Sequence, residues 1–182
     1  MGNQELMSDL ESQKRMIQEL QAQLQQKEAM LSQIKQKISQ SVYGLSSADF
    51  AVTEKQGKLY ISMSQNLLFP SGSIRLDAKG EQALQQLATA LKNNPGIDIT
   101  VEGHTDTDGS AAQNWELSMQ RAIAVVNALT NYGVDPYRIT AAGRSYFDPV
   151  ATNATASGKA LNRRTEIILS PQLDELMDLM NQ

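Results

Sequence analysis

A heptad repeat in residues 1–43 constrains the fold of this chain more than any other feature. Its apolar positions are Leu6, Leu10, Ile17, Leu20, Leu24, Leu31, Ile34 and Ile38, and the seam is interrupted at Gln13, Lys27 and Ser41. The stretch has no proline, and no glycine after Gly2. This spacing predicts one long helix with an a/d stripe. Roughly 40 residues at 1.5 Å each give a rod of about 60 Å.

The apolar stripe on this helix is narrow and regular, which favours self-association. We therefore predict that residues 1–43 are a coiled-coil stalk through which the chain forms a homo-oligomer. A single amphipathic helix that folds back on its own domain is the alternative. The mixture of Leu and Ile at the a positions leaves dimer and trimer open.

Composition narrows the possible functions. The 182 residues carry a net charge of −4, so no basic field attracts nucleic acid. The absence of cysteine removes disulfides, thiolate nucleophiles and thiolate metal sites. No apolar run approaches the ~20 residues that span a bilayer, and the polar start of the chain lacks the apolar core of a signal peptide. Either the protein is cytoplasmic, or a targeting segment lies upstream of Met1.

Residues 44–170 are predicted to form one α+β domain. Alternating residues indicate strands at 58–64, 97–102, 138–143 and 164–169, and helical periodicity indicates helices at 77–93 and 110–132. The order β-α-β-α-β-β predicts a sandwich in which a mixed four-stranded sheet packs on helices. Residues 171–182 form an acidic, amphipathic tail, for which we predict a short docked helix without an assigned function.

A carboxylate and a guanidinium stand at a suggestive spacing. Asp106 follows a predicted strand, and Arg121 lies on the next helix, where it shares one stripe with Asn114, Leu117 and Ser118. The start of this helix favours an anion. Arg121 could therefore grip a ligand carboxylate, while Asp106 receives an ammonium. The two side chains could equally pair with each other and brace the loop, and spacing alone does not decide between these interpretations.

Two other groups of polar residues carry weaker signals. Glu102, His104, Asp106 and Asp108 alternate like metal ligands, but Asp-rich loops mostly cap and turn, so we predict no metal and no cofactor. His104 is the chain's only histidine, and we expect it to be structural rather than catalytic. Two adjacent arginines near residue 163 point to opposite faces if extended, so one can reach a ligand while the other faces solvent or braces a loop.

Four ordered motifs resemble the OmpA-like C-terminal domain, a family that includes the peptidoglycan-associated lipoprotein and the periplasmic domain of the flagellar stator protein. The motifs are Gly103-His104-Thr105-Asp106 with Gly109, Asn114-x-x-Leu117-Ser118-x-x-Arg121-Ala122, Gly133-Val134 followed by Arg138-Ile139, and Gly158 followed by Asn162-Arg163-Arg164. Each motif alone is weak, but their order and spacing together are specific. The resemblance runs from about Leu59 to Leu169.

The resemblance implies non-covalent binding of peptidoglycan through the diaminopimelate of its stem peptide. Asp106 and Arg121 match the family residues that hold the diaminopimelate end groups. Further positions implied for the ligand are Thr105, Asn114, Leu117 and Arg163, with Phe69 and Ser71 near the loop after the first strand. The motifs leave two aromatics near the expected site, Trp115 and Tyr146, without a role.

These observations predict a non-enzymatic module in the periplasm, associated with the outer membrane, that tethers the membrane or envelope to the cell wall. An anchor, either a lipid or a membrane segment, is expected upstream of the chain. One alternative is a peptidoglycan hydrolase or amidase, which needs a metal with an open position or two carboxylates across the bond. The other is a purely structural coiled-coil envelope protein.

Overall fold

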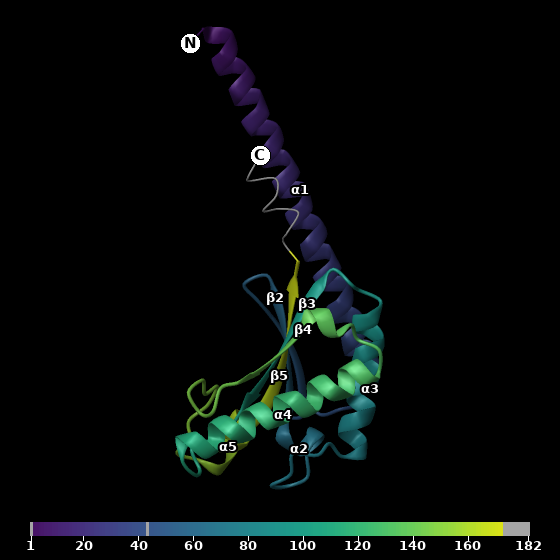
Figure 1. The fold of residues 1–182 in the computed structure, drawn as a ribbon, viewed down its shortest axis with the longest axis vertical. Coiled ribbons are helices and arrows are strands. Elements are labelled where there is room, and N and C mark those ends of the chain that lie inside the picture. The colour runs from purple at the N-terminus through teal and green to yellow at the C-terminus, as the bar shows by residue number, and fades with distance from the viewer. Residues whose placement is uncertain (1, 43, 173–182) are drawn as a thin grey trace.

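The computed structural model describes residues 2–42 and 44–172, and it shows a long helix projecting from an α+β domain (Figure 1). The elements in chain order are α1 (Asn3–Ser41), β1 (Phe50–Lys55), β2 (Lys58–Ser64), α2 (Gln65–Leu68), α3 (Ala78–Lys92), β3 (Ile97–His104), α4 (Ala111–Asn131), the 3-10 helix η1 (Pro136–Arg138), β4 (Ile139–Gly143), α5 (Ala156–Asn162) and β5 (Arg164–Pro171). Among the residues that the structure describes, every helix is too short or too polar to serve as a membrane span. Residues 173–182 of the predicted tail lie outside the described part of the chain.

The sheet is mixed, as predicted, and its strand order is β1-β2-β5-β3-β4. In the described part of the chain, β3 and β4 pair in parallel, and the other neighbouring strands are antiparallel. The predicted number of four strands is corrected to five by β1. This strand pairs with β2 through a two-residue turn, in which Gln56 and Gly57 both have positive φ, as a type I′ hairpin requires. Its polar second half, Thr53–Lys55, hides the alternation that would reveal it.

The helices cover one face of the sheet. On β3, Ile97, Ile99 and Val101 are buried beneath them, whereas Asp98 and Glu102 alternate onto the other face. Helix α4 packs on β3 and β4, and α3 lies between α4 and α1. This two-layer α+β arrangement confirms the predicted fold class.

Helix α1 divides its apolar stripe between two environments. Leu31, Ile34 and Ile38 are buried in the core of the domain, where the helix packs on α3 and β2. Four residues nearer its N-terminus are open, with exposed fractions from 48% to 67%: Leu6, Leu10, Ile17 and Leu24. The last turns of the helix therefore fold onto the domain, as the alternative interpretation expected. Self-association of the exposed part stays a prediction.

Side-chain caps fix the ends of the two helices that cover the sheet. Asp77 accepts a hydrogen bond from the backbone N–H of Gly80 at the start of α3. Ser110 and Gln113 form a capping box at the start of α4. At the far end of α3, buried Arg138 donates to the carbonyl oxygens of Leu91, Asn94 and Ile97. Arg138 thereby joins the end of α3 to the start of β3.

Candidate functional site

The predicted site residues converge at one end of the sheet because three neighbouring strands begin or end there. Strand β5 lies between β2 and β3 and runs antiparallel to both. Its first residue, Arg164, therefore pairs with Ser64 at the end of β2 and with His104 at the end of β3. The first turns of α4 and the short helices α2 and α5 gather at this same end (Figure 1).

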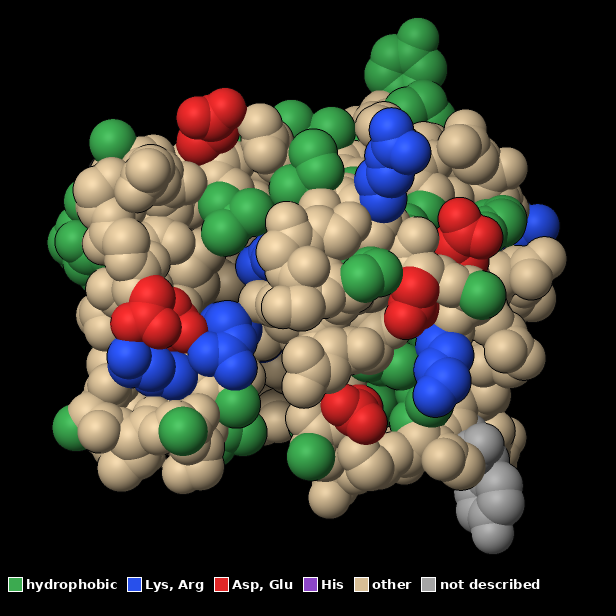
Figure 2. Space-filling view, turned by 90° about the horizontal axis from the view of Figure 1, so that it is seen from below, with side chains coloured by type: hydrophobic (Ala, Val, Ile, Leu, Met, Phe, Trp, Pro, Cys, Tyr) green, Lys and Arg blue, Asp and Glu red, His purple; other side chains and the backbone are tan. Residues whose placement is uncertain are grey.

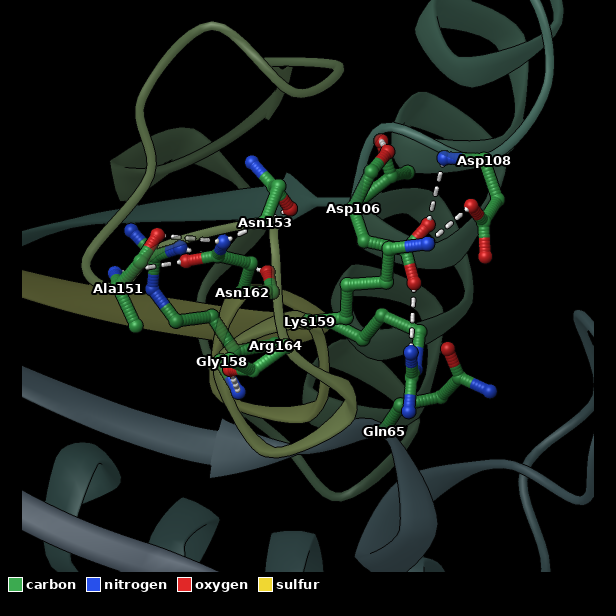
Figure 3. Close-up of polar contacts among 12 residues, drawn as sticks. Gln65, Asp106, Asp108, Ala151, Asn153, Gly158, Lys159, Asn162 and Arg164 are labelled. Carbon is green, nitrogen blue, oxygen red and sulfur yellow. Dashed lines mark hydrogen bonds and ion pairs between the residues drawn. The ribbon is translucent and has the colours of Figure 1, made fainter.

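Asp106 is buried in the loop after β3, and its partners differ from the predicted one. Its Oδ2 lies 2.5 Å from Nη1 of Arg163, and its Oδ1 accepts a hydrogen bond from the backbone N–H of Asp108 at 3.0 Å. The carboxylate of Asp108 pairs in turn with Nζ of Lys159 at 2.6 Å. Figure 3 shows Asp106 and Asp108 side by side above Lys159. Two acid–base pairs therefore hold this loop against α5.

Arg121 is buried, with 4% of its surface exposed, and among the described residues its hydrogen bonds go to neutral oxygens. Its Nη1 donates to Oε1 of Gln65 at 2.9 Å, and its Nε donates to the carbonyl of Ser73 at 3.3 Å. Its guanidinium also lies over the ring of Phe69, 5.5 Å from the centroid. Burial, followed by the charge of Arg163, lowers the pKa of Arg121, and the nearby Asp106 raises it.

The alternative in which Asp106 and Arg121 pair with each other to brace the loop is wrong, because each side chain has other partners. Within the described ranges, no ion pair joins these two side chains. Burying a charge is unfavourable unless a counter-charge compensates it. Asp106 supplies one negative charge close to two guanidinium groups, those of Arg121 and Arg163. The site therefore carries excess positive charge and favours one further anion.

Five other predicted positions differ in their burial and contacts. The amide of Asn114 donates to the carbonyl of Asp108 at 2.8 Å, and the hydroxyl of Thr105 donates to the carbonyl of Asp106 at 3.0 Å. Both side chains are buried and shape the loop. Leu117 is half-buried on α4. Phe69 is fully buried, and its ring packs against the guanidinium of Arg121. Ser71 is exposed.

The Asn162-Arg163-Arg164 motif divides its side chains as predicted. Arg163 turns toward Asp106, while Arg164 bonds to Glu166 at 2.7 Å and to the carbonyl of Asp148 at 3.1 Å. Asn162 is fully buried, and its Oδ1 accepts hydrogen bonds from two backbone N–H groups of the 150–151 loop. One arginine therefore serves the site and the other braces a loop.

Gly103 allows α4 to approach β3 closely enough to carry Arg121 into the site. A Cβ at this position would lie 2.0 Å from the carbonyl oxygen of Ser118. Such an overlap with backbone cannot be relieved by a side-chain movement. The glycine of the motif is thus a packing requirement for the helix.

The four residues considered as metal ligands, Glu102, His104, Asp106 and Asp108, fall into two groups with different partners in the structure. His104 is buried on the other face of the sheet, where its Nε2 lies 3.6 Å from Glu102 and 3.8 Å from Glu166. Ligand atoms of Glu102 and His104 lie within 4.8 Å of Asp148 rather than near Asp106 and Asp108. Contact with His104 lowers the pKa of Glu102, and the charges of nearby arginines act in the same direction against burial.

Sequence reasoning missed Gln65, Ser73 and Lys159. Gln65 directly follows β2, and its position next to the start of β5 depends on strand order. Lys159 lies on α5, four residues before the C-cap residue Arg163, and no helix was predicted there. Figure 2 views this end of the molecule and shows acidic and basic side chains adjoining one another rather than segregated by sign.

The fold and the polar cluster together define a class: an α+β domain with a buried group of paired charges at the ends of its strands. The chain belongs to the OmpA family, which matches residues 68–163. The probable lipoprotein YiaD of Escherichia coli is 41% identical over 121 residues, which cover 66% of this chain and 55% of YiaD. The chain thus spans about half the length of this relative.

Two other similar proteins have names that refer to the cell wall. The peptidoglycan-binding protein ArfA of Mycobacterium tuberculosis is 39% identical over 89 residues, covering 49% of this chain and 27% of ArfA. The cell wall anchor of the T6SS from Pseudomonas aeruginosa superposes with a TM-score of 0.66 at 32% identity, covering 74% of this chain and 97% of that structure.

Proposed function

We propose that this chain binds peptidoglycan non-covalently through the diaminopimelate of the stem peptide. The observation that carries the proposal is the buried guanidinium of Arg121 near the carboxylate of Asp106. Within residues 2–42 and 44–172, this guanidinium donates its hydrogen bonds to neutral oxygens. The free end of diaminopimelate bears an ammonium and a carboxylate on one carbon. Arg121 binds this carboxylate, and Asp106 binds this ammonium. The names of ArfA and of the T6SS cell wall anchor support a wall ligand.

Asp106 can accept the ammonium without losing its present partners. A carboxylate offers about four lone-pair sites, and Arg163 and the N–H of Asp108 occupy two. Arg121 likewise retains Nη2, which donates no hydrogen bond within the part of the chain that the structure describes. The ligand therefore completes a network that is already assembled, so that little reorganisation opposes binding.

The expected affinity for a single stem peptide is modest. An attraction of one charge pair at 4 Å amounts to about 4 kcal/mol in a half-shielded site, and desolvation opposes it. A dissociation constant of roughly 0.01–1 mM follows. Attachment at several points of a polymer raises the effective strength without new contacts. The exposed stripe of α1 supplies such multivalency if it brings copies of the domain together.

The proposal includes a place in the cell envelope. The domain tethers the envelope to the wall from the periplasm, in association with the outer membrane, and α1 separates the domain from an anchor upstream. Binding without cleavage is also part of the proposal. The two loop carboxylates are each paired with a cation, Asp106 with Arg163 and Asp108 with Lys159, which favours holding a ligand over general acid–base chemistry.

Co-sedimentation with purified sacculi tests the proposal. We expect Asp106→Asn and Arg121→Lys each to weaken binding by about tenfold or more, because each removes one charge-assisted contact. The exposed residues Asp9 and Arg15 on α1 provide matched controls, Asp9→Asn and Arg15→Lys, that should bind like the parent. Sacculi whose stem peptides carry lysine instead of diaminopimelate lack the carboxylate and should bind weakly.

The same assay separates the alternatives. Unchanged binding by folded Asp106→Asn and Arg121→Lys would contradict the site assignment. Release of soluble fragments from labelled sacculi would establish a hydrolase. Failure of the parent chain to sediment with any sacculi would leave a purely structural envelope protein.

A further inference from the structure

An exposed aromatic ledge stands on α4 and on the loop after β4. Trp115 is 46% exposed and Phe147 is 60% exposed. Their rings stack with centroids 5.6 Å apart at 27°, and Tyr146 adds a third ring 4.7 Å from Phe147. Single exposed apolar residues are common, but contiguous apolar patches mark binding sites. We call Trp115, Tyr146 and Phe147 the aromatic ledge.

The ledge is held rigidly from beneath by Ser145, which is fully buried. Its backbone N–H donates to the hydroxyl of Ser118, and its own hydroxyl donates to the carbonyl of Ala111. These two residues precede and follow Trp115 on α4. Ser145 also adopts a φ of 51°, an unfavourable backbone conformation for a residue with a side chain. The loop is therefore fixed in one shape, which reduces the entropy that a ligand must overcome.

The ledge is continuous with the Asp106–Arg121 site. Trp115 directly follows Asn114, whose amide holds the carbonyl of Asp108. The carbonyl of Ser145, next to Tyr146, accepts a hydrogen bond from the N–H of Thr105 at 2.9 Å. Each half of the ledge is thus one residue away from a residue that positions the Asp106 loop. The ledge and the Asp106–Arg121 site therefore share the same supporting residues on α4 and on the loop after β4.

The dimensions of the proposed polymer suit a second contact about one helix width from the site. A helix with its side chains is about 10–12 Å across. Diaminopimelate is the third residue of a stem peptide, and three extended residues reach roughly 10 Å. Trp115 of the ledge and Arg121 of the site lie six residues apart on α4, so a stem peptide held at Asp106 and Arg121 can place its sugar against the ledge.

The charge around the ledge favours a neutral partner. Arg144 and Asp148, the charged residues that flank Tyr146 and Phe147 in sequence, pair with each other at 3.7 Å and are each about half exposed. Their charges cancel, while their donors and acceptors remain available to hydroxyl groups. Flat aromatic faces beside such groups suit a ring with one apolar C–H face and a polar rim.

Resting on the proposed function, we infer that Trp115, Tyr146 and Phe147 form a subsite for the N-acetylated sugar rings of the glycan strand. The domain then binds two parts of one polymer. Asp106 and Arg121 bind the stem peptide, and the aromatic ledge binds the glycan. The inference predicts that the chain binds glycan lacking peptide, although weakly.

The chain contains one tryptophan, so the fluorescence of Trp115 reports directly on the ledge. We expect chitotetraose, a neutral N-acetylglucosamine tetramer, to change the emission of the full chain saturably. Phe147→Ala keeps the reporter and should weaken this response and the affinity for sacculi by roughly three- to tenfold. The affinity of Phe147→Ala for a soluble diaminopimelate tripeptide should stay unchanged. Tyr137→Ala, at an aromatic residue 98% exposed elsewhere, is the matched control and should behave like the parent.

The outcomes separate the ledge from the Asp106–Arg121 site. An emission that chitotetraose leaves unchanged, together with parental sacculus binding by Phe147→Ala, overturns the glycan subsite. Emission that changes with protein concentration alone also overturns it, because the ledge is then a contact between copies of the chain. Loss of tripeptide binding in the parent contradicts the proposed function instead, and a saturable chitotetraose response in that case still supports the ledge.

Discussion

Nη1 of Arg121 donates a hydrogen bond to Oε1 of Gln65, which lies 56 residues earlier in the chain. The acceptor is a neutral amide, although a carboxylate of nearly the same shape would pair more strongly with a guanidinium. The neutral partner leaves the charge of Arg121 available to a ligand. Gln65 therefore positions Arg121 without neutralising it.

This relationship predicts opposite effects of one substitution on stability and on binding. Gln65→Glu supplies the missing counter-charge, so we expect a higher melting temperature and at least about tenfold weaker sacculus binding. Gln65→Ala removes the hydrogen bond without adding charge and should reduce binding less. Calorimetry and co-sedimentation on the same preparations check both effects. Parental wall binding by Gln65→Glu would show that the guanidinium does not receive a ligand anion.

Glu102, His104 and Glu166 form a cluster on the face of the sheet opposite the helices, and this cluster predicts that the stability of the domain depends on pH. The folded-state pKa of Glu102 is lowered by His104, with help from Arg144 and Arg164. A lowered carboxyl pKa contributes stability above the unfolded pKa of about 4.3, and this stability is lost as pH falls through the folded pKa. The carboxylates of Glu166 and Asp148 also face this cluster.

Glu102→Gln should therefore lose less unfolding free energy than the parent when the pH falls from about 5 to about 3. Urea unfolding at a series of pH values measures this difference. Glu54→Gln on the exposed part of β1 is the control and should follow the parent. Parallel profiles for Glu102→Gln and the parent would contradict the linkage.

The contact between Gly103 and Ser118 predicts a large loss of stability from a single methyl group. Gly103→Ala places Cβ 2.0 Å from a backbone oxygen, so α4 must move and we expect a loss of about 3 kcal/mol or more. Gly96→Ala, where a Cβ meets no atom within 4 Å, should stay within about 1 kcal/mol of the parent. Urea denaturation compares the two. Equal stability of both variants would exclude the close approach of the helix.

The two environments of α1 predict separable effects along one stripe. Ile34→Ala removes fully buried atoms and should cost about 2–5 kcal/mol of domain stability. Ile17→Asn, at a position 55% exposed, should leave that stability nearly unchanged but reduce self-association. Urea unfolding and sedimentation velocity measure the two quantities. Sedimentation of the parent as a monomer at all concentrations would contradict the coiled-coil prediction.

Periodicity predicted the elements whose side chains alternate clearly between core and solvent. The helices expected at 77–93 and 110–132 appear as Ala78–Lys92 and Ala111–Asn131. The strand expected at 58–64 has the predicted bounds, and the one expected at 164–169 extends to Pro171. Strand β1 was missed because only Phe50 and Val52 turn inward. Helix α5 was missed because it is short and lies in a stretch rich in turn residues.

The site was only partly accessible from sequence because spacing describes one element at a time. The stripe on α4 predicted correctly that Asn114 and Arg121 share a face. It could not show that Arg163 rather than Arg121 pairs with Asp106, because that contact depends on β5 lying beside β3. The contacts of Arg121 with Gln65 and Ser73 arise in the same way, from strand order and loop packing.

The docked end of α1 determines how force would pass through a wall-bound chain. The helix leaves the domain at the end opposite α2 and α5, where the site lies (Figure 1). A pull between wall and stalk therefore acts along the strands, in the direction that loads the β2–β5 ladder in shear. Its hydrogen bonds then resist together instead of opening one after another. Because Leu31, Ile34 and Ile38 are buried in the domain core, the helix would transmit this force to the domain directly and would not act as a flexible linker.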